Sequence, residues 1–113
     1  MVTLSVLTPT YNRVKTLERL YESLVRQSSN DFEWIVIDDG STDTTKEYIE
    51  SISQCPQFKI IYRRIKNGGK HRALNYAMEY ADSKLAICVD SDDWLPEDSI
   101  ETIISKYREN CFG

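Results

Sequence analysis

Two clusters of aspartates are the residues of this sequence whose types and spacing are best suited to chemistry. They comprise Asp38, Asp39 and Asp43, and Asp90, Asp92 and Asp93. Two carboxylates about 5 Å apart repel each other by roughly 3 kcal/mol at an effective dielectric constant of about 20. A hard divalent cation such as Mg²⁺ or Mn²⁺ converts that repulsion into binding. Because a helix cap needs only one acid, the three acids in Asp90-Ser91-Asp92-Asp93 indicate a metal site.

The first cluster lies where an apolar run ends in Asp38-Asp39-Gly40. A turn accounts for the glycine, but an acid pair is a poor choice at the end of a buried strand unless it meets a ligand. A carboxylate at this point accepts N–H bonds from a nucleobase or O–H bonds from a ribose. Of the two acids, Asp39 is the predicted ligand-binding residue.

The segment Thr8-Pro9-Thr10-Tyr11-Asn12-Arg13 follows the first apolar run. It is either a plain strand-to-helix turn, with Asn12 near the helix cap, or part of a nucleotide site. In the second interpretation Tyr11 stacks on a base, and Thr8 or Pro9 offers backbone contacts.

A basic segment, Asn67-Gly68-Gly69-Lys70-His71-Arg72, precedes a predicted helix. Two glycines permit close approach of the backbone to an anion, and a helix N-terminus attracts one. Lys70 and Arg72 add charge for a diphosphate. The alternative is a turn with a solvated basic helix start, and the single histidine, His71, receives no role.

Composition bounds the class of protein. The chain has 113 residues, enough for one domain over residues 1–113, and 41% of them are hydrophobic. A net charge of −4 makes general nucleic-acid binding an unlikely function class. Three widely spaced cysteines without a CxxC pair predict reduced thiols in a cytosolic protein, with Cys88 as a small core residue. No apolar run approaches the roughly 20 residues of a membrane span, so we expect at most peripheral contact with the inner membrane face.

Strands and helices are predicted to alternate. The predicted strands cover residues 3–8, 32–37, 58–65 and 85–89. The predicted helices cover residues 14–25 and 45–52, a segment around residues 74–81, and a segment whose first helical residue is Pro96. Thr44 and Glu47 match a capping box for the second helix.

Near-continuous apolar strands indicate a parallel sheet with helices on both faces. Right-handed crossovers then predict an α/β, Rossmann-like three-layer sandwich with strand order 3-2-1-4. In that order the carboxyl ends of the second and fourth strands lie roughly 10 Å apart, with the first strand between them. Both aspartate clusters are therefore expected to line one crevice.

The sequence resembles the family 2 glycosyltransferases in four motifs. These are SVLTPTYNR, WIVIDDGSTDTT, NGGKHRALNYA and ICVDSDDWLPEDSI, in this order along nearly the whole chain. The resemblance implies a GT-A fold, of which residues 1–113 would be the nucleotide-diphospho-sugar-binding half, without the acceptor-binding half. It also implies that Asp39 binds the base, most often uracil, in a pocket with Tyr11 and Thr8, and that Lys70 and Arg72 lie near the nucleotide.

The same resemblance places a DxD metal motif in the second cluster. Asp90 would lie near the ribose, and Asp92 would hold Mg²⁺ or Mn²⁺ on the diphosphate. Asp93 could serve instead, because the DxDD run leaves the register open. The implied reaction transfers a sugar, from UDP by preference, to an acceptor hydroxyl, and a metal stabilises the charge on the departing diphosphate.

Several points stay open at the level of sequence. The general base is expected beyond Gly113, so no catalytic residue is assigned, and the acceptor is a saccharide, a lipid or a protein, with cell-surface polysaccharide synthesis as the expected setting. A non-catalytic module that binds nucleotide diphosphate and metal is the alternative function. Dinucleotide binding is disfavoured because GxGxxG is missing after the first strand. An exposed edge at the fourth strand predicts self-association.

Overall fold

A four-stranded parallel sheet organises the protein, as a computed structural model of residues 2–54, 56–66 and 68–110 describes it. The strands stand in the order β3-β2-β1-β4, which confirms the predicted topology. The elements are β1 (Leu4–Thr10), α1 (Val14–Val25), β2 (Phe32–Asp38), α2 (Thr45–Ile52), β3 (Lys59–Arg64), α3 (Lys70–Tyr80), β4 (Leu85–Cys88) and α4 (Ser99–Asn110). Within the described ranges, no helix is both long and apolar enough to cross a bilayer.

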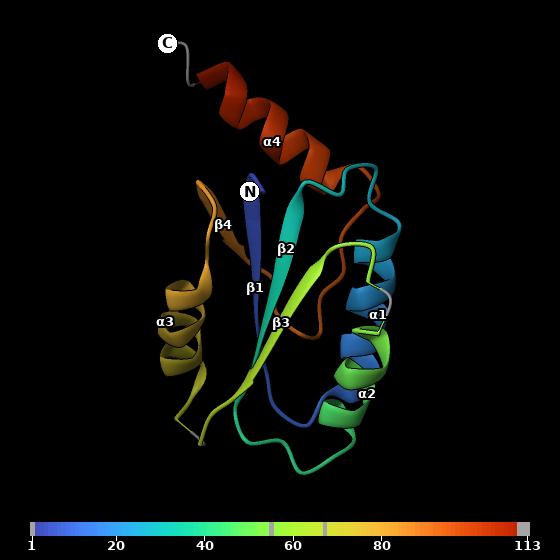
Figure 1. Cartoon of the computed structure of the whole chain (residues 1–113), viewed down its shortest axis with the longest axis vertical. Helices are drawn as coiled ribbons and strands as arrows, with labels where there is room; N and C mark the ends of the chain where they lie inside the picture. Colours follow the sequence, from blue (N-terminus) through green and yellow to red (C-terminus); the bar gives the residue numbers. More distant parts are fainter. Residues whose placement is uncertain (1, 55, 67, 111–113) are drawn as a thin grey trace.

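Helices cover both faces of the sheet. Figure 1 shows α3 on one face and α1 with α2 on the other, while α4 lies across the end at which β1 and β2 begin. Alternate residues of β2 point to the two faces: Trp34 lies in a large apolar cluster on the α1 face, and Ile35 and Ile37 lie in a smaller one with Ala73 of α3. Every residue of β2 is buried, which is the pattern of a central strand in a covered parallel sheet.

The fourth strand departs from the prediction of burial on both faces. Ala86 and Cys88 are exposed, so the interpretation of Cys88 as a core residue was wrong. The reason is that β4 lies at the edge of the sheet while α3 packs over β1 and β2, which leaves one face of β4 open. Cys55 and Cys111 lie outside the described residues.

A buried carboxylate fixes the start of β4. Glu33 is 2% exposed, and its Oε2 accepts hydrogen bonds from the Ser5 hydroxyl at 2.6 Å and from the Asp82 N–H at 2.9 Å. The Ser5 and Ser83 hydroxyls lie 2.6 Å apart and share a hydrogen bond. The turn before β4 is thereby attached to the two central strands, and the attachment sets where β4 and its following loop lie.

The start of α2 differs from the predicted capping box. Thr44 makes no side-chain cap; instead Asp43 Oδ1 accepts from the Thr45 N–H at 3.0 Å, and Asp43 Oδ2 accepts from the Val14 N–H at 3.3 Å. Asp43 thus accepts from free N–H groups of two helices, in the place of the predicted cap by Thr44.

The helix α4 begins at Ser99, not at Pro96. Gln27 is the reason: its Nε2 donates to the Pro96 carbonyl at 2.7 Å, and its Oε1 accepts from the Ile100 N–H at 3.0 Å. Gln27 therefore holds the turn that precedes α4, which the Ser99 N–H closes on the Pro96 carbonyl at 3.1 Å, and it caps the helix from a distance.

We expect Asp43→Ala to destabilise the protein by about 1–2 kcal/mol, because free N–H groups of α1 and α2 lose their acceptor. Burial alone would raise the pKa of Asp43, but the hydrogen bonds from Thr45 and Val14 outweigh it and lower the pKa. This contribution is therefore present above about pH 4 and is lost as the pH falls through the folded-state pKa. Urea unfolding at several pH values measures it. Thr44→Ala is the control and should change the unfolding free energy little; an equal loss in both variants would contradict the assignment.

Candidate functional site

A crevice of about 230 Å³ opens at the carboxyl ends of the strands. Its lining consists of Pro9, Thr10, Tyr11, Arg13, Asp39, Lys70, Ala73, Asp90, Ser91 and Asp92. It lies beside β1, where the sheet's connections change direction between β2 and β4. The two aspartate clusters, which are far apart in sequence, thus contribute to a single crevice.

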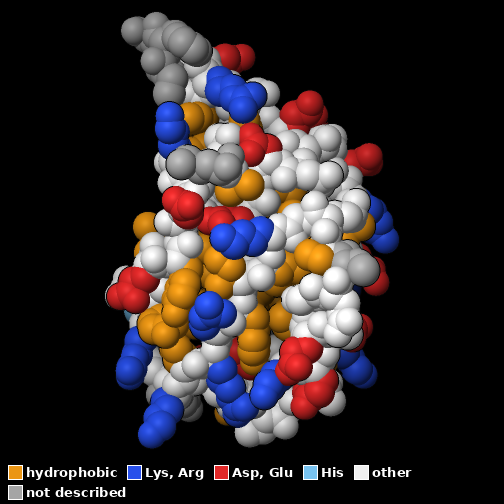
Figure 2. All heavy atoms as spheres, viewed as in Figure 1, with side chains coloured by type: hydrophobic (Ala, Val, Ile, Leu, Met, Phe, Trp, Pro, Cys, Tyr) orange, Lys and Arg blue, Asp and Glu red, His pale blue; other side chains and the backbone are white. Residues whose placement is uncertain are grey.

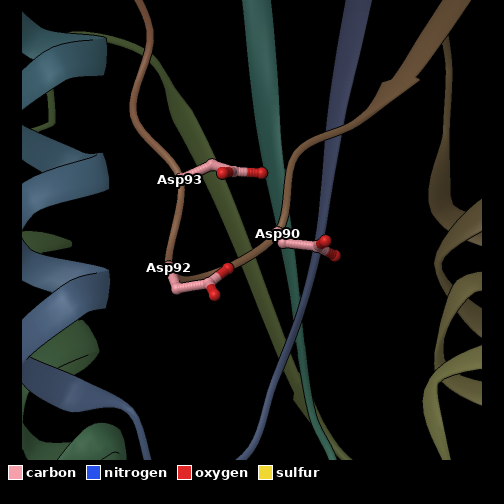
Figure 3. Close-up of side chains that lie close together, drawn as sticks. All are labelled: Asp90, Asp92 and Asp93. Atoms are coloured by element: carbon pink, nitrogen blue, oxygen red, sulfur yellow. The ribbon is translucent and has the colours of Figure 1, made fainter.

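The turn after β4 brings three carboxylates together. One oxygen from each of Asp90, Asp92 and Asp93 lies within 4.8 Å of the others, and Figure 3 shows the three side chains leaving the turn toward the same side. The Asp93 N–H donates to the Asp90 carbonyl at 3.0 Å, which tightens the turn. Opposite ligands of an octahedral ion with bonds of about 2.1 Å lie about 4.2 Å apart, so this spacing fits one ion after small side-chain adjustments.

The chemistry of the donors also suits a hard cation. Carboxylate oxygens are the ligands that Mg²⁺ and Mn²⁺ prefer. Cys88, nearby in sequence, is not part of this group of donors, and partial desolvation of its thiol, with a further contribution from Asp90, raises its pKa. The residues present therefore fit the predicted metal.

Two basic side chains lie against the acidic turn. Lys70 Nζ, from the start of α3, is 2.7 Å from Asp90 Oδ1, and the hydrogen bond raises the pKa of Lys70. Arg13 Nη1, just before α1, is 3.4 Å from Asp92 Oδ2. Lys and Arg side chains also gather toward the lower end of the face in Figure 2, which is the end where the strands of Figure 1 finish.

Asp39 is part of the crevice lining, whereas Asp38 is not. Asp39 is 8% exposed, and its two oxygens accept from the N–H groups of Gly68 at 2.7 Å and Gly69 at 3.0 Å. Asp38 accepts from the Tyr62 hydroxyl and the Ser41 N–H, and so it has a structural role. Of the two acids, Asp39 is thus the one in the lining, and its role in ligand binding stays a prediction.

Asn12 joins the turns that follow β1 and β2. It has a positive φ of 50°, and its Oδ1 accepts from the Thr42 N–H at 2.7 Å and the Asp43 N–H at 3.2 Å. Its own N–H donates to the Ser41 hydroxyl at 2.8 Å. Asparagine tolerates this left-handed conformation better than most residues do, so Asn12 orients both Tyr11 and Arg13 on the rim of the crevice.

The remaining predicted residues separate into two groups. Pro9 and Tyr11 line the crevice, and Tyr11 is 46% exposed. Thr8 is fully buried, and its hydroxyl accepts from Trp34 Nε1 at 2.9 Å, so its side chain lies behind the crevice. Arg72 and Asp93 are exposed but are not part of the lining.

Thr10, Arg13 and Ser91 also line the crevice, although the sequence pointed to no individual role for any of them. The Thr10 hydroxyl stands out, because among residues 2–54, 56–66 and 68–110 it is the one buried side-chain polar atom without a hydrogen-bond partner. A buried hydroxyl without a partner is costly and needs an explanation. A ligand in the crevice that it lines would supply one. Nearly all of β1 is buried, and Thr10 shares in this burial, but nothing in the sequence indicates that its hydroxyl lacks a partner.

Residues 5–113 match the family described as Glycosyl transferase family 2. This chain belongs to glycosyl transferase family 2. The match covers all four motifs that carried the resemblance, and it confirms that inference.

Curated relatives of this family 2 chain are considerably longer proteins. The glycosyltransferase GlyA of Streptococcus pneumoniae is 31% identical over 106 residues, which are 94% of this chain and 15% of GlyA. The poly(ribitol-phosphate) beta-N-acetylglucosaminyltransferase TarS of Staphylococcus aureus is 32% identical over 103 residues, 89% of this chain and 18% of TarS. The chain thus spans less than a fifth of the length of either relative.

Solved structures confirm the fold of the family 2 chain. S. aureus TarS 1–349 in complex with UDP-GlcNAc matches 96% of this chain and 32% of that structure, with 29% identity and a TM-score of 0.89. The mannosyltransferase PcManGT of Pyrobaculum calidifontis, in complex with GDP-Man and Mn²⁺, matches 82% of this chain and 28% of that structure, with 27% identity and a TM-score of 0.77. The sheet order and the likeness to TarS establish the Rossmann-like GT-A fold.

Two threonines of β1 should respond in opposite ways to the same substitution. Thr10→Val should raise the unfolding free energy by about 1 kcal/mol, because it removes a buried hydroxyl that lacks a partner. Thr8→Val should lower it by about 1–3 kcal/mol, because Trp34 Nε1 loses its acceptor. Chemical denaturation of both variants measures the contrast. Destabilisation by Thr10→Val would mean that its hydroxyl is already bonded within the protein.

Proposed function

We propose that this chain binds a nucleoside-diphosphate sugar, by preference a UDP-sugar, through a divalent cation held at Asp92 or Asp93 together with Asp90. The observation that carries the proposal is the meeting of Asp39, Asp90, Asp92 and Lys70 in one crevice. Acidic side chains suited to a cation stand beside basic side chains suited to phosphate. The complexes of TarS with UDP-GlcNAc and of PcManGT with GDP-Man and Mn²⁺ support this assignment.

At the base end of the crevice, Tyr11 offers an exposed ring for stacking, and Pro9 forms part of the wall. Each oxygen of Asp39 already accepts one backbone N–H, and each retains a second acceptor site for a base N–H. Thr8 supports this end from behind by fixing Trp34. Lys70 lies on the phosphate side, and Arg72, outside the lining, would act only from the rim.

In the transfer reaction, a bound cation would supply Lewis-acid stabilisation of the negative charge that develops on the departing diphosphate. Asp92 or Asp93 would hold that cation, and Asp90 would accept from ribose hydroxyls or share the cation. We place the carboxylate that deprotonates the acceptor hydroxyl, and the acceptor site, outside residues 1–113. The greater length of GlyA and TarS supports that placement.

The chain by itself has two candidate activities. The first is transfer of a sugar, and the alternative is binding of nucleotide and metal without transfer. Release of UDP from a UDP-sugar, measured with and without added acceptor saccharides, separates the two. The relation to TarS, a poly(ribitol-phosphate) transferase, makes a cell-surface polymer the first acceptor to test.

Calorimetric titration with UDP should show binding that depends on a divalent cation. We expect Mn²⁺ to tighten UDP binding by roughly tenfold or more, which corresponds to about 1.4 kcal/mol. Mg²⁺ should act in the same direction, because the donors are carboxylates. The control titration uses uridine, which has no phosphate and should gain little from the cation. Equal affinity for UDP with and without Mn²⁺ would count against the metal role.

Asp92→Ala should weaken Mn²⁺-dependent binding of UDP by roughly tenfold without lowering the melting temperature. The side chain of Asp92 is 52% exposed, and it forms an exposed ion pair with Arg13. Removal of Asp92 should therefore cost little stability. Asp93→Ala, titrated alongside, determines which of the two acids contributes more to the cation site. Asp98→Ala is the matched control, because Asp98 is exposed and outside the crevice lining. A large fall in melting temperature for Asp92→Ala would show a structural role instead.

A further inference from the structure

The two ion pairs of the crevice join its opposite walls to the same turn. Lys70 reaches Asp90 from the start of α3, and Arg13 reaches Asp92 from the start of α1. All four side chains belong to residues that line the crevice. The basic groups that could contact a diphosphate are therefore held on the carboxylates that could contact a cation.

The backbone on both sides directs these two bases to the turn. Asn12 has a φ of 50° immediately before Arg13, and Gly69 has a φ of 85° immediately before Lys70. The first is held by hydrogen bonds to the turn after β2, and the second by Asp39. Because specific hydrogen bonds fix Asn12 and Gly69, the backbone positions of Arg13 and Lys70 are fixed as well.

The pairs themselves are weak enough to exchange. The side chains are between 40% and 56% exposed, and exposed ion pairs contribute about 0–1 kcal/mol. A divalent cation carries twice the charge of either base and binds carboxylate oxygen directly, so it competes well for Asp90 and Asp92. A basic side chain that the cation displaces from its carboxylate stays in the crevice without a negatively charged partner.

A second observation, which is independent of the charges, favours a polar ligand in this crevice. Thr10, which is 3% exposed, is one of the lining residues, and its buried hydroxyl lacks a hydrogen-bond partner within the described part of the chain. A polar group bound beside Thr10 would supply that partner.

We propose that Lys70 and Arg13 are exchangeable counter-ions: a divalent cation displaces them from Asp90 and Asp92, and they then bind the oxygens of the diphosphate. This rests on the proposed function and extends it to Arg13, for which the sequence suggested no role. It makes the binding of cation and diphosphate mutually dependent. The cation frees Lys70 and Arg13 to bind the diphosphate, and the diphosphate neutralises the two bases that the cation has displaced. By linkage, UDP must tighten Mn²⁺ binding by the same factor by which Mn²⁺ tightens UDP binding.

The exchange predicts opposite effects of one substitution on two ligands. In Lys70→Met, Mn²⁺ alone should bind about two- to fivefold more tightly, because its competitor at Asp90 has gone. UDP in the presence of saturating Mn²⁺ should bind roughly tenfold more weakly, because a charge-assisted contact to phosphate is lost. Arg13→Met should show the same signs with smaller sizes, because its pair is longer. Calorimetry measures UDP binding, and the electron paramagnetic resonance signal of free Mn²⁺ measures metal binding.

Controls separate exchange from a general effect of charge. Lys84→Met removes the same charge from an exposed residue before β4, at the opposite end of that strand from the crevice, and should leave both affinities unchanged. Lys70→Arg keeps a charged donor and should retain most of the UDP affinity. The decisive quantity is the factor by which UDP tightens Mn²⁺ binding, which should fall in Lys70→Met.

The outcomes distinguish this inference from the proposed function. If the unaltered chain shows no Mn²⁺-dependent binding of UDP, the proposed function itself fails. If it does show such binding, but Lys70→Met leaves Mn²⁺ affinity unchanged or weaker, or leaves the coupling factor unchanged, the exchange is wrong and the proposed function stands. Tighter Mn²⁺ with weaker UDP in Lys70→Met, and neither change in Lys84→Met, supports the exchange.

Discussion

Repulsion among carboxylates at the ends of parallel strands is the constraint on which this site depends. A parallel sheet brings the carboxyl ends of its strands to one edge, and here that edge collects Asp39 from β2 and Asp90 with Asp92 from β4. Such charges stay close only if cations or N–H groups neutralise them. The structure provides both, in the form of Lys70 and Arg13 for the second cluster and two backbone N–H groups for Asp39.

The loops around the crevice are held by side chains that bind backbone groups. Asn12 and Asp43 join the turn after β2 to the turn after β1, and Asp39 joins it to the start of α3. Ser23 and Gln27 of the α1 region hold the segment that follows the acidic turn, through the Leu95 N–H and the Pro96 carbonyl. These bonds fix loops that would otherwise be the least ordered part of an α/β fold.

The fold was predictable because periodicity and strand order are both strongly constrained by the sequence. The helix bounds at 14–25 and 45–52 and the order β3-β2-β1-β4 agree with prediction. Burial of β4 and the start of α4 were not predictable from local patterns. The first depends on how far α3 extends across the sheet, and the second on Gln27, about 70 residues away in the chain.

The same distinction applies to the candidate site. Acidic and glycine-rich motifs showed where charge gathers, because that follows from residue type and topology alone. The partners of individual side chains did not follow. Nothing local indicates that the hydroxyl of Thr8 bonds to Trp34 while that of Thr10, two residues later, lacks a partner, or that Asp39 binds Gly68 and Gly69. Those contacts depend on side-chain directions set by tertiary packing.

The two hydrogen bonds that Asp39 accepts from Gly68 and Gly69 couple its position to that of Lys70. Asp39 is part of the crevice lining, and its carboxylate also anchors the peptide just before Lys70. A group that draws Asp39 away from Gly69 loosens the stem of the lysine, and a group that leaves those bonds intact keeps the lysine in place. A displacement of Asp39 would in this way reach Lys70 through two peptide groups, without movement of the sheet.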